Sequence, residues 1–530
     1  MYNDQPVTTL RPGLVALLGM AALAWFLWLS MKPVLIGINS DAAVYALLAD
    51  WMSPWRPADI DFGARLFAHY PFPPLYPLLL AMVGGGSAAP RIDYGLGALL
   101  QALAVVAAWC WARRAGLGSA GAAVAALSLA ITPIALFTVM GVFSEPCYIA
   151  LSMAALALVA AAAPSPRAWR GAAALLGFAA LTRGVGLFAV AALLLSWAWR
   201  TRGRHARLVP LLALAPPLLW MGVKALNGWQ VSYTNSLLRG GLSAALTSLA
   251  EQLPINLHAL AYHFVRCFDL LGGRHTALVC AALLVPAALS VATRLRSGKA
   301  DALYVVLYLL VITVWPYPND LARFLLILLP LFGASACHGV SLLLASVGRS
   351  RLAVAGRVLV ALLLLLVVLP SLLHVTLMIA TAANAEERIY TRMSAWYGHD
   401  SLAKSRTATA FARRVLDVMA TLREQVPRDA CVTSTMAETV MLESHRYSRP
   451  PAGARESLDK LRAGLAACPY VLLLRATVFP AIDFPYYYPL ERVRGELIAI
   501  STVALEQRAD HATPLAILAR YRGHDVPADE

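Results

Sequence analysis

Charged residues are scarce in this chain, and acidic residues are scarcer than basic ones. Only 14% of the 530 residues are charged, against about 25% in an average soluble domain, and 59% are hydrophobic. The mean hydropathy is +0.65. This composition excludes an ordinary soluble domain and indicates a polytopic membrane protein.

The seven cysteines lack the CxxC spacing that is typical of zinc and redox sites. Cys110, Cys280 and Cys337 fall in apolar runs, where a thiol usually packs as a small hydrophobic side chain. Cys431 and Cys468 lie instead in the polar C-terminal part of the chain, beside predicted strands. Two alternatives stay open for this pair, which are a disulfide in an oxidising compartment and two free buried thiols. The sequence also lacks internal repeats and low-complexity linkers.

Long apolar runs are what the sequence has in abundance. A helix needs about 20 apolar residues to cross a bilayer, and eleven runs come near this length, two of them short. They cover residues 13–31, 94–112, 119–139, 145–163, 170–182, 184–199, 208–224, 276–293, 302–316, 323–346 and 358–380. No small-residue cleavage site follows the first run, so a retained helix is predicted there rather than a signal peptide.

Basic residues predict the orientation of these spans. Clusters such as Arg113-Arg114 and Arg294 to Lys299 occupy alternate connections, and acidic residues are almost absent from these connections. Arg183 divides the fifth run from the sixth, and merging the two runs would move later basic clusters to the other face. The positive-inside rule then predicts a cytoplasmic N-terminus and an external C-terminus. The net charge of +15 reflects orientation and contact with anionic membrane lipids, and it indicates no nucleic-acid partner.

The predicted domains are a transmembrane domain over residues 1–380, with outer loops 32–93 and 225–275, and a polar tail over residues 381–530. Within the tail, Ser405 to Gln425 predicts a helix, and residues 430–434 and 470–474 predict short strands. Helices that alternate with such strands are typical of a small α/β domain.

Ionisable and aromatic side chains at the outer ends of the spans are the candidate functional residues, because charges beside a span are costly and usually functional. Asp41 follows the first span, and a His-Pro cluster follows it. The candidate residues are Asp41, Tyr45, His69, Tyr70, Glu145, Arg183, Asp320 and Arg323. A carboxylate can take a proton from a hydroxyl, and arginines can hold a phosphate, so this set fits a lipid-linked sugar phosphate.

Each candidate also has a structural alternative. Asp41 and Glu145 would stabilise the first turn of a helix through its dipole, and His69 could serve only to cap or to pack. Arg183 could reach toward lipid headgroups. Arg323 could form an ion pair with Asp320.

Four sequence patterns, taken in order after Asp41, resemble those of the GT-C superfamily of polyprenyl-phosphate-sugar glycosyltransferases. The patterns are His69-Tyr70-Pro71-Phe72-Pro73-Pro74-Leu75-Tyr76-Pro77, Phe143-Ser144-Glu145-Pro146, Leu181-Thr182-Arg183 and Arg323-Phe324-Leu325-Leu326. They are similar to the bacterial branch related to protein O-mannosyltransferases and to the lipid A aminoarabinose transferase. Residues 10–380 carry the resemblance, and the tail looks like the periplasmic domain of many members.

The resemblance implies a GT-C fold in the bacterial inner membrane, with the tail in the periplasm. It implies inverting transfer of a monosaccharide from a polyprenyl-phosphate donor to a lipid, glycan or protein acceptor, with Asp41 as the base. It also implies that Glu145 is a second acid and that Arg183 or Arg323 meets the donor phosphate. Many relatives carry two adjacent acids after the first span, whereas Ala42 follows Asp41 here.

We expect no cofactor, although a divalent cation shared by Asp41, Glu145 and His69 is a less favoured alternative. Two other functions compete with monosaccharide transfer. A transporter would show repeats and ionisable residues at mid-membrane. A ligase or polymerase that uses polyprenyl-diphosphate glycans would depend mainly on a large outer loop.

Overall fold

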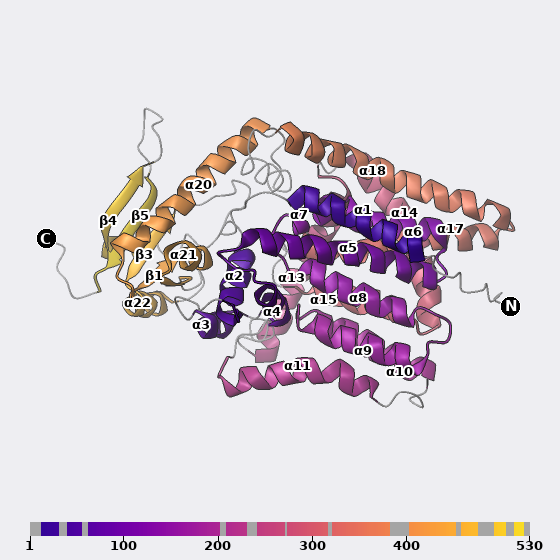
Figure 1. Cartoon of the computed structure of the whole chain (residues 1–530), viewed down its shortest axis with the longest axis horizontal. Helices are drawn as coiled ribbons and strands as arrows, with labels where there is room; N and C mark the ends of the chain where they lie inside the picture. The colour runs from indigo at the N-terminus through magenta and orange to yellow at the C-terminus, as the bar shows by residue number, and fades with distance from the viewer. Residues whose placement is uncertain are drawn as a thin grey trace. The chain divides into compact units, whose positions relative to one another are not determined.

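A computed structural model describes most of the chain (Figure 1). The described residues are 12–30, 40–55, 62–70, 72–201, 208–229, 241–270, 273–315, 321–381, 402–451, 457–474, 492–504 and 514–523. Asp320 lies outside them. The chain divides into two compact units, of which the first comprises residues 1–31, 64–83 and 91–377. The second unit comprises residues 32–63, 84–90 and 378–530.

The first unit is helical, as the apolar runs predict. Its helices are α1 (Pro12–Ser30), α3 (Gly63–His69), α4 (Leu75–Met82), α5 (Pro90–Arg114), α6 (Gly118–Ala130), α7 (Pro133–Val139), α8 (Glu145–Val159), α9 (Pro166–Ala180), α10 (Gly186–Thr201), α11 (Val209–Leu226), α13 (Gly241–Phe268), α14 (Arg274–Arg296), α15 (Ala300–Thr313), α16 (Leu321–Leu325), α17 (Leu328–Ser346) and α18 (Ala353–Thr381), with a short 3₁₀ turn at Ser350–Leu352. Figure 1 shows α8, α9, α10 and α11 running side by side.

Each predicted span coincides with at least one helix. Six helices among the described residues are long and apolar enough to cross a membrane, and a bent pair could make a seventh. Helices α8, α10 and α15 are apolar but shorter. The protein is therefore a helical membrane protein, and the count of eleven spans stays a prediction.

The predicted span at 119–139 is bent, because α6 and α7 meet at an angle of 50°. Pro133 begins α7, and the residue before it, Thr132, is extended at φ −68° and ψ 145°. A proline has no N–H to donate and excludes the helical conformation at the preceding residue, so the helix breaks here. The run at 323–346 is divided between α16 and α17, with Leu326 and Ile327 between the two helices.

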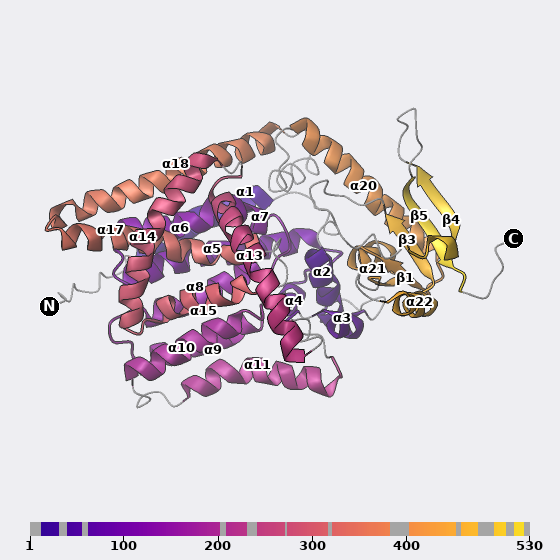
Figure 2. The same ribbon diagram turned by 180° about the vertical axis from the view of Figure 1, so that it is seen from behind.

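The outer loop predicted at 225–275 contains a long helix, α13, which the sequence analysis did not anticipate. Figure 2 shows α13 running steeply across α15. The buried Asn256 side chain of α13 donates to the carbonyls of Thr313 and Trp315, at 3.0 and 2.7 Å, and so fixes α13 on the end of α15. These two carbonyls lie at the C-terminal end of α15, where no further N–H of the helix is available to donate to them.

The second unit contains the small α/β domain that the tail sequence predicts. Its elements are α20 (Leu402–Gln425), β1 (Cys431–Ser434), α21 (Ala437–Ser444), β2 (Tyr447–Arg449), α22 (Leu458–Ala467), β3 (Tyr470–Leu474), a 3₁₀ turn at Arg494–Glu496, β4 (Leu497–Ala504) and β5 (Pro514–Tyr521). The sheet order is β2-β1-β3-β5-β4, with β1 parallel to β2 and β3, and β5 antiparallel to β3 and β4. Cys431 and Cys468 form a disulfide between the start of β1 and the end of α22.

Helix α2 (Ser40–Met52) also belongs to the second unit and packs on α21. Its residues 42–49 are all buried, as an apolar helix packed on several sides requires. Both carboxylate oxygens of Asp50, near the end of α2, accept from the Ser87 backbone N–H at 3.2 Å. The division of the chain at residue 380 stays a prediction.

Candidate functional site

Three of the sequence-predicted residues meet at one point in the first unit. Nη1 of Arg183 and Nε of Arg323 each lie 2.6 Å from the same oxygen of Glu145, Oε1. The Glu145 side chain is 3% exposed, and the two arginine side chains are 13% and 14% exposed. The cluster therefore brings two guanidiniums and one carboxylate together in a nearly buried place.

Local sequence explains why each of the three side chains reaches this point. Glu145 is the first residue of α8 and is followed by Pro146, whose missing N–H costs nothing in the first turn of a helix. Arg183 lies in the turn between α9 and α10. Arg323 lies in the short helix α16, just before the break that separates it from α17.

Two aromatic rings complete the cluster. The guanidinium carbon of Arg183 lies 4.7 Å from the centre of the Phe324 ring, and that of Arg323 lies 4.5 Å from the centre of the Phe143 ring. A cation over an aromatic face is attracted to it, and the attraction grows as water is excluded. The rings therefore fix both guanidinium planes. Sequence reasoning quoted both phenylalanines within its motifs but gave them no role, although each stands within two positions of a charged candidate.

Tyrosines and a serine also contribute polar groups that the sequence analysis did not single out. Arg183 donates to the hydroxyl of Ser144 at 3.4 Å. The hydroxyl of Tyr148 on α8 lies 2.6 Å from that of Tyr304 on α15. The hydroxyl of Tyr308 donates to the carbonyl of Phe324 at 3.0 Å. The signal available in the sequence was the spacing of Tyr304 and Tyr308, which puts both hydroxyls on one face of α15.

The His-Pro segment joins the turn that carries Arg183. The backbone N–H of Leu75, which begins α4, donates to the carbonyl of Leu181 at 2.9 Å. His69 ends α3, and its Nδ1 lies 2.7 Å from the carbonyl of Arg65, which fits the capping alternative. Tyr70 stacks on Phe72, with ring centres 5.9 Å apart.

Asp41 and Tyr45 lie in the second unit, on α2. Asp41 is in the first turn of α2 and half-buried, and Tyr45 is 2% exposed. The first-turn position is the one that the structural alternative requires, and it leaves a base role equally open. The roles assigned to all these residues stay predictions.

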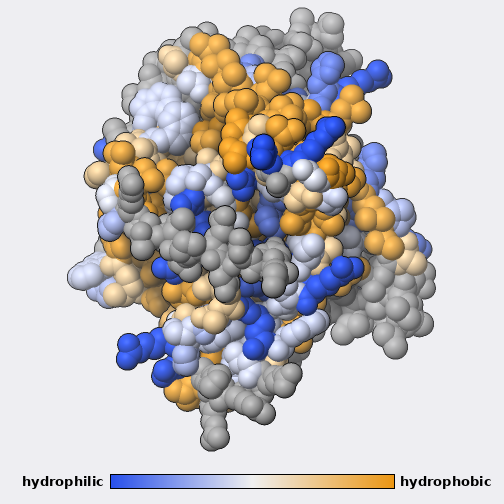
Figure 3. Space-filling view, turned by 90° about the vertical axis from the view of Figure 1, so that its right-hand side faces the viewer, coloured by the Kyte–Doolittle hydropathy of each residue, from blue (hydrophilic) through white to orange (hydrophobic). Residues whose placement is uncertain are grey.

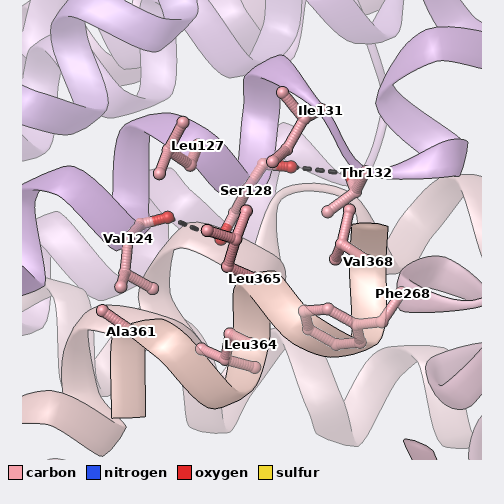
Figure 4. Close-up of a pocket in the computed structure, with 10 residues that line it drawn as sticks. All are labelled: Val124, Leu127, Ser128, Ile131, Thr132, Phe268, Ala361, Leu364, Leu365 and Val368. Atoms are coloured by element: carbon pink, nitrogen blue, oxygen red, sulfur yellow. Dashed lines mark hydrogen bonds between the residues drawn. The ribbon is translucent and has the colours of Figure 1, made fainter. Parts of the chain in front are cut away.

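The described residues include no group of three or more His, Cys, Asp or Glu side chains placed to hold a metal ion. A separate groove between α6, α18 and the end of α13 is apolar (Figure 4). The hydroxyls of Ser128 and Thr132 in this groove donate to carbonyls within their own helix turn, at 2.7 and 2.6 Å. The residues that line the groove include no charged side chain, so the groove has no cationic group to bind a phosphate.

Comparison with solved structures shows the fold. The apo oligosaccharyltransferase of Archaeoglobus fulgidus matches with a TM-score of 0.52 and 14% identity, over 87% of this chain and 70% of that one. ArnT from Cupriavidus metallidurans matches in its apo state with a TM-score of 0.50 and 14% identity, over 97% of this chain and 98% of that one. The same enzyme bound to undecaprenyl phosphate gives a TM-score of 0.50 and 14% identity, over 97% and 99% of the two chains.

No protein-family model and no curated protein sequence matches the chain. The structural likenesses confirm the fold that the sequence resemblance implied, which is that of the GT-C membrane glycosyltransferases.

Proposed function

We propose that this protein is an integral-membrane inverting glycosyltransferase that moves a monosaccharide from a polyprenyl-phosphate donor to an acceptor hydroxyl. The proposal places the reaction at the periplasmic face of the bacterial inner membrane. The acceptor is a lipid, a glycan or a protein.

The observation that carries the proposal is the convergence of Arg183 and Arg323 on one carboxylate, that of Glu145. Both guanidiniums lie 2.6 Å from the same Glu145 oxygen, and both are nearly buried. A phosphate is the group that arginines bind best with paired, charge-assisted hydrogen bonds. The fold supports the same ligand, because ArnT, a structure with this fold, was solved bound to undecaprenyl phosphate.

In the proposed reaction, the acceptor oxygen forms a bond to the anomeric carbon while the bond from that carbon to the phosphate oxygen breaks. The electron pair of the broken bond stays on the phosphate, which leaves as polyprenyl phosphate with one more negative charge. Arg183 and Arg323 stabilise that charge, which is larger in the transition state than in the donor. Asp41 takes the hydroxyl proton, and this role rests on its position after the first span.

The central experiment measures the release of polyprenyl phosphate from a polyprenyl-phosphate monosaccharide by the purified full chain. Asp41→Asn should lower the turnover by about 10²- to 10⁴-fold, as the loss of a general base does. Donor binding should persist in this variant. Near-normal turnover by Asp41→Asn would contradict the assignment of Asp41 as the general base.

The arginine assignment needs its own variants. Arg323→Gln and Arg183→Gln should each raise the donor KM or lower kcat/KM by about 10-fold or more, since charged hydrogen bonds contribute about 1.5–3 kcal/mol. Arg167→Gln is the matched control, because Arg167 is exposed at the other end of α9. An unchanged donor dependence in both test variants would refute the phosphate role.

Two further measurements distinguish the proposed function from a ligase or polymerase and from a metal-dependent reaction. Consumption of a polyprenyl-diphosphate glycan, with no reaction of the monophosphate donor, would indicate a ligase or polymerase instead. The proposed mechanism uses no metal, so activity should persist in excess chelator. Loss of activity there, restored by a divalent cation, would contradict this part of the proposal.

A further inference from the structure

A second group of positive charges lies at the end of the first unit away from Arg183, around the last turn of α8. Nη2 of Arg200 donates to the carbonyl oxygen of Ala161 at 2.8 Å, and Nζ of Lys299 lies 3.4 Å from the same oxygen. Arg200 also donates to the carbonyls of Val159 and Ala162, at 3.1 and 2.6 Å. Two cations from separate helices therefore share one neutral acceptor.

No carboxylate in the described part of the chain pairs with either cation. Asp301 is the acid of this region, and its two oxygens are taken by Arg294 and by the indole N–H of Trp111, the latter at 3.0 Å. The sequence has no Asp or Glu at all from residue 146 to residue 250. The end of α8 offers only about half a negative charge, so capping leaves most of the charge of two cations uncompensated.

The pKa of Lys299 agrees with an excess of positive charge around it. Burial, and then the nearby Arg200 and Arg294, lower this pKa from its usual 10.5 to about 8, and they outweigh Asp301, which acts to raise it. The site thus holds its cations at a cost that a bound anion would remove.

Packing contacts position the two cations. Lys299 caps α15 after the turn at Gly298, whose carbonyl accepts from the buried Ser196 hydroxyl of α10 at 2.6 Å. Arg200 lies over the ring of Trp169, with its guanidinium carbon 5.6 Å from the ring centre. An anion would find both donors already placed, which lowers the entropy cost of binding.

Apolar side chains flank the cations on the outside of α10. Leu195 and Trp199 lie one turn apart on the helix and are 50% and 60% exposed. Tryptophan is typical of the headgroup level of a membrane. Figure 3, which views this end of the first unit, shows hydrophilic side chains bordered by hydrophobic ones. The surroundings therefore fit a phosphate that carries hydrocarbon chains.

We propose that Arg200 and Lys299 form a binding site for the phosphate of an anionic phospholipid, with Leu195 and Trp199 against its hydrocarbon. This site is separate from the cluster around Glu145 and does not depend on the glycosyl-transfer proposal. Its occupant stabilises the junction of α8, α10 and α15.

The test uses the full chain in detergent, titrated with phosphatidylglycerol, phosphatidylcholine or inorganic phosphate, and followed by native mass spectrometry and thermal unfolding. Phosphatidylglycerol should be retained and should raise the unfolding temperature, whereas the other two should do neither. The double variant Arg200→Gln/Lys299→Gln should bind it about 30-fold more weakly, given about 1 kcal/mol for each cation at a membrane surface.

The matched control is Arg349→Gln/Arg351→Gln, which removes two exposed cations from the connection between α17 and α18. This control should retain the response to phosphatidylglycerol. An equal loss in test and control variants would overturn the site, because it would show a general charge effect. An equal response to inorganic phosphate would overturn the lipid assignment.

A measurement on the unaltered protein tests the proposed site even if the variants do not fold. The chain has five lysines, so amine labelling can be read at each one by mass spectrometry. Lys299 should be labelled readily near pH 8 in phosphatidylcholine and should be protected in phosphatidylglycerol. Equal labelling of Lys299 in both lipids would contradict the proposal.

Discussion

Arg323 and Glu145 stand 178 positions apart in the chain, and the Nε of Arg323 donates to the Oε1 of Glu145 at 2.6 Å. Arg183 lies at the same distance from the same oxygen. This junction ties α8, α16 and the turn between α9 and α10 to one carboxylate. Each of three separate sequence motifs therefore depends on the other two for its place in the fold.

Glu145→Gln should destabilise the first unit. The variant keeps the size of the side chain but removes the carboxylate that both nearly buried guanidiniums contact, and breaking a buried ion pair in this way costs about 3–5 kcal/mol. Thermal or denaturant unfolding of the purified chain measures the loss.

Glu496→Gln is the control for this change. Glu496 pairs with Arg462 in the second unit, where the two side chains are 19% and 23% exposed, so its loss should cost less stability than the loss of the more deeply buried Glu145. A Glu145→Gln protein as stable as the Glu496→Gln protein would show that the buried cluster does not hold the helices together.

Removal of the disulfide by Cys431→Ser/Cys468→Ser should destabilise the α/β domain. The bridge closes a loop of 37 residues, and loops of this length correspond to about 3–4 kcal/mol of unfolding free energy. Denaturant unfolding and limited proteolysis of the full chain would detect the change. Cys110→Ser, at a free thiol, should have little effect. Equal resistance of the bridged and unbridged proteins to proteolysis would contradict this prediction.

Gly86→Ala should lower the stability of the second unit. Gly86 has φ +121°, which strains any other residue by about 1–3 kcal/mol, and a Cβ there would meet Oδ1 of Asp50 at 2.1 Å. Gly95→Ala is the control, because its Cβ would meet nothing within 4 Å.

A second variant separates the two causes. Gly86→Ala combined with Asp50→Ala removes the clash and leaves the backbone strain, so the double variant should lose less than the two single changes added together. Strict additivity of the unfolding free energies would show that Asp50 and residue 86 do not meet.

Lys299 should make the stability rise with pH above about 8. Its pKa in the folded protein is about 8 and its ordinary value is 10.5, so the unfolded chain binds more protons between these two values. Stability therefore increases with pH across that window, and the cost of the buried charge is fully present below it.

Unfolding midpoints measured from pH 7 to pH 10.5 would test this. Lys299→Gln should be more stable than the unaltered protein at pH 7. Its stability should rise less with pH, because it lacks the ammonium group that titrates in this window. A parallel pH dependence for the two proteins would contradict the lowered pKa of Lys299.

The sequence by itself determined the membrane class, the position of each helix that is long and apolar enough to span a membrane, and the α/β character of the tail. These follow from local properties, because an apolar run of span length or a short β-branched segment between turns carries its own signal. Composition also indicated the chemistry, since the few charges stand at the ends of apolar runs.

Only the tertiary structure decided which of those charges meet. No local pattern links Glu145 to both Arg183 and Arg323, places α2 with the tail in one unit or joins Cys431 to Cys468. The same holds for Arg200 and Lys299, which come together only through packing at the end of α8. Contacts between residues far apart in the chain depend on how whole helices pack, and a single sequence records the helices but not their packing.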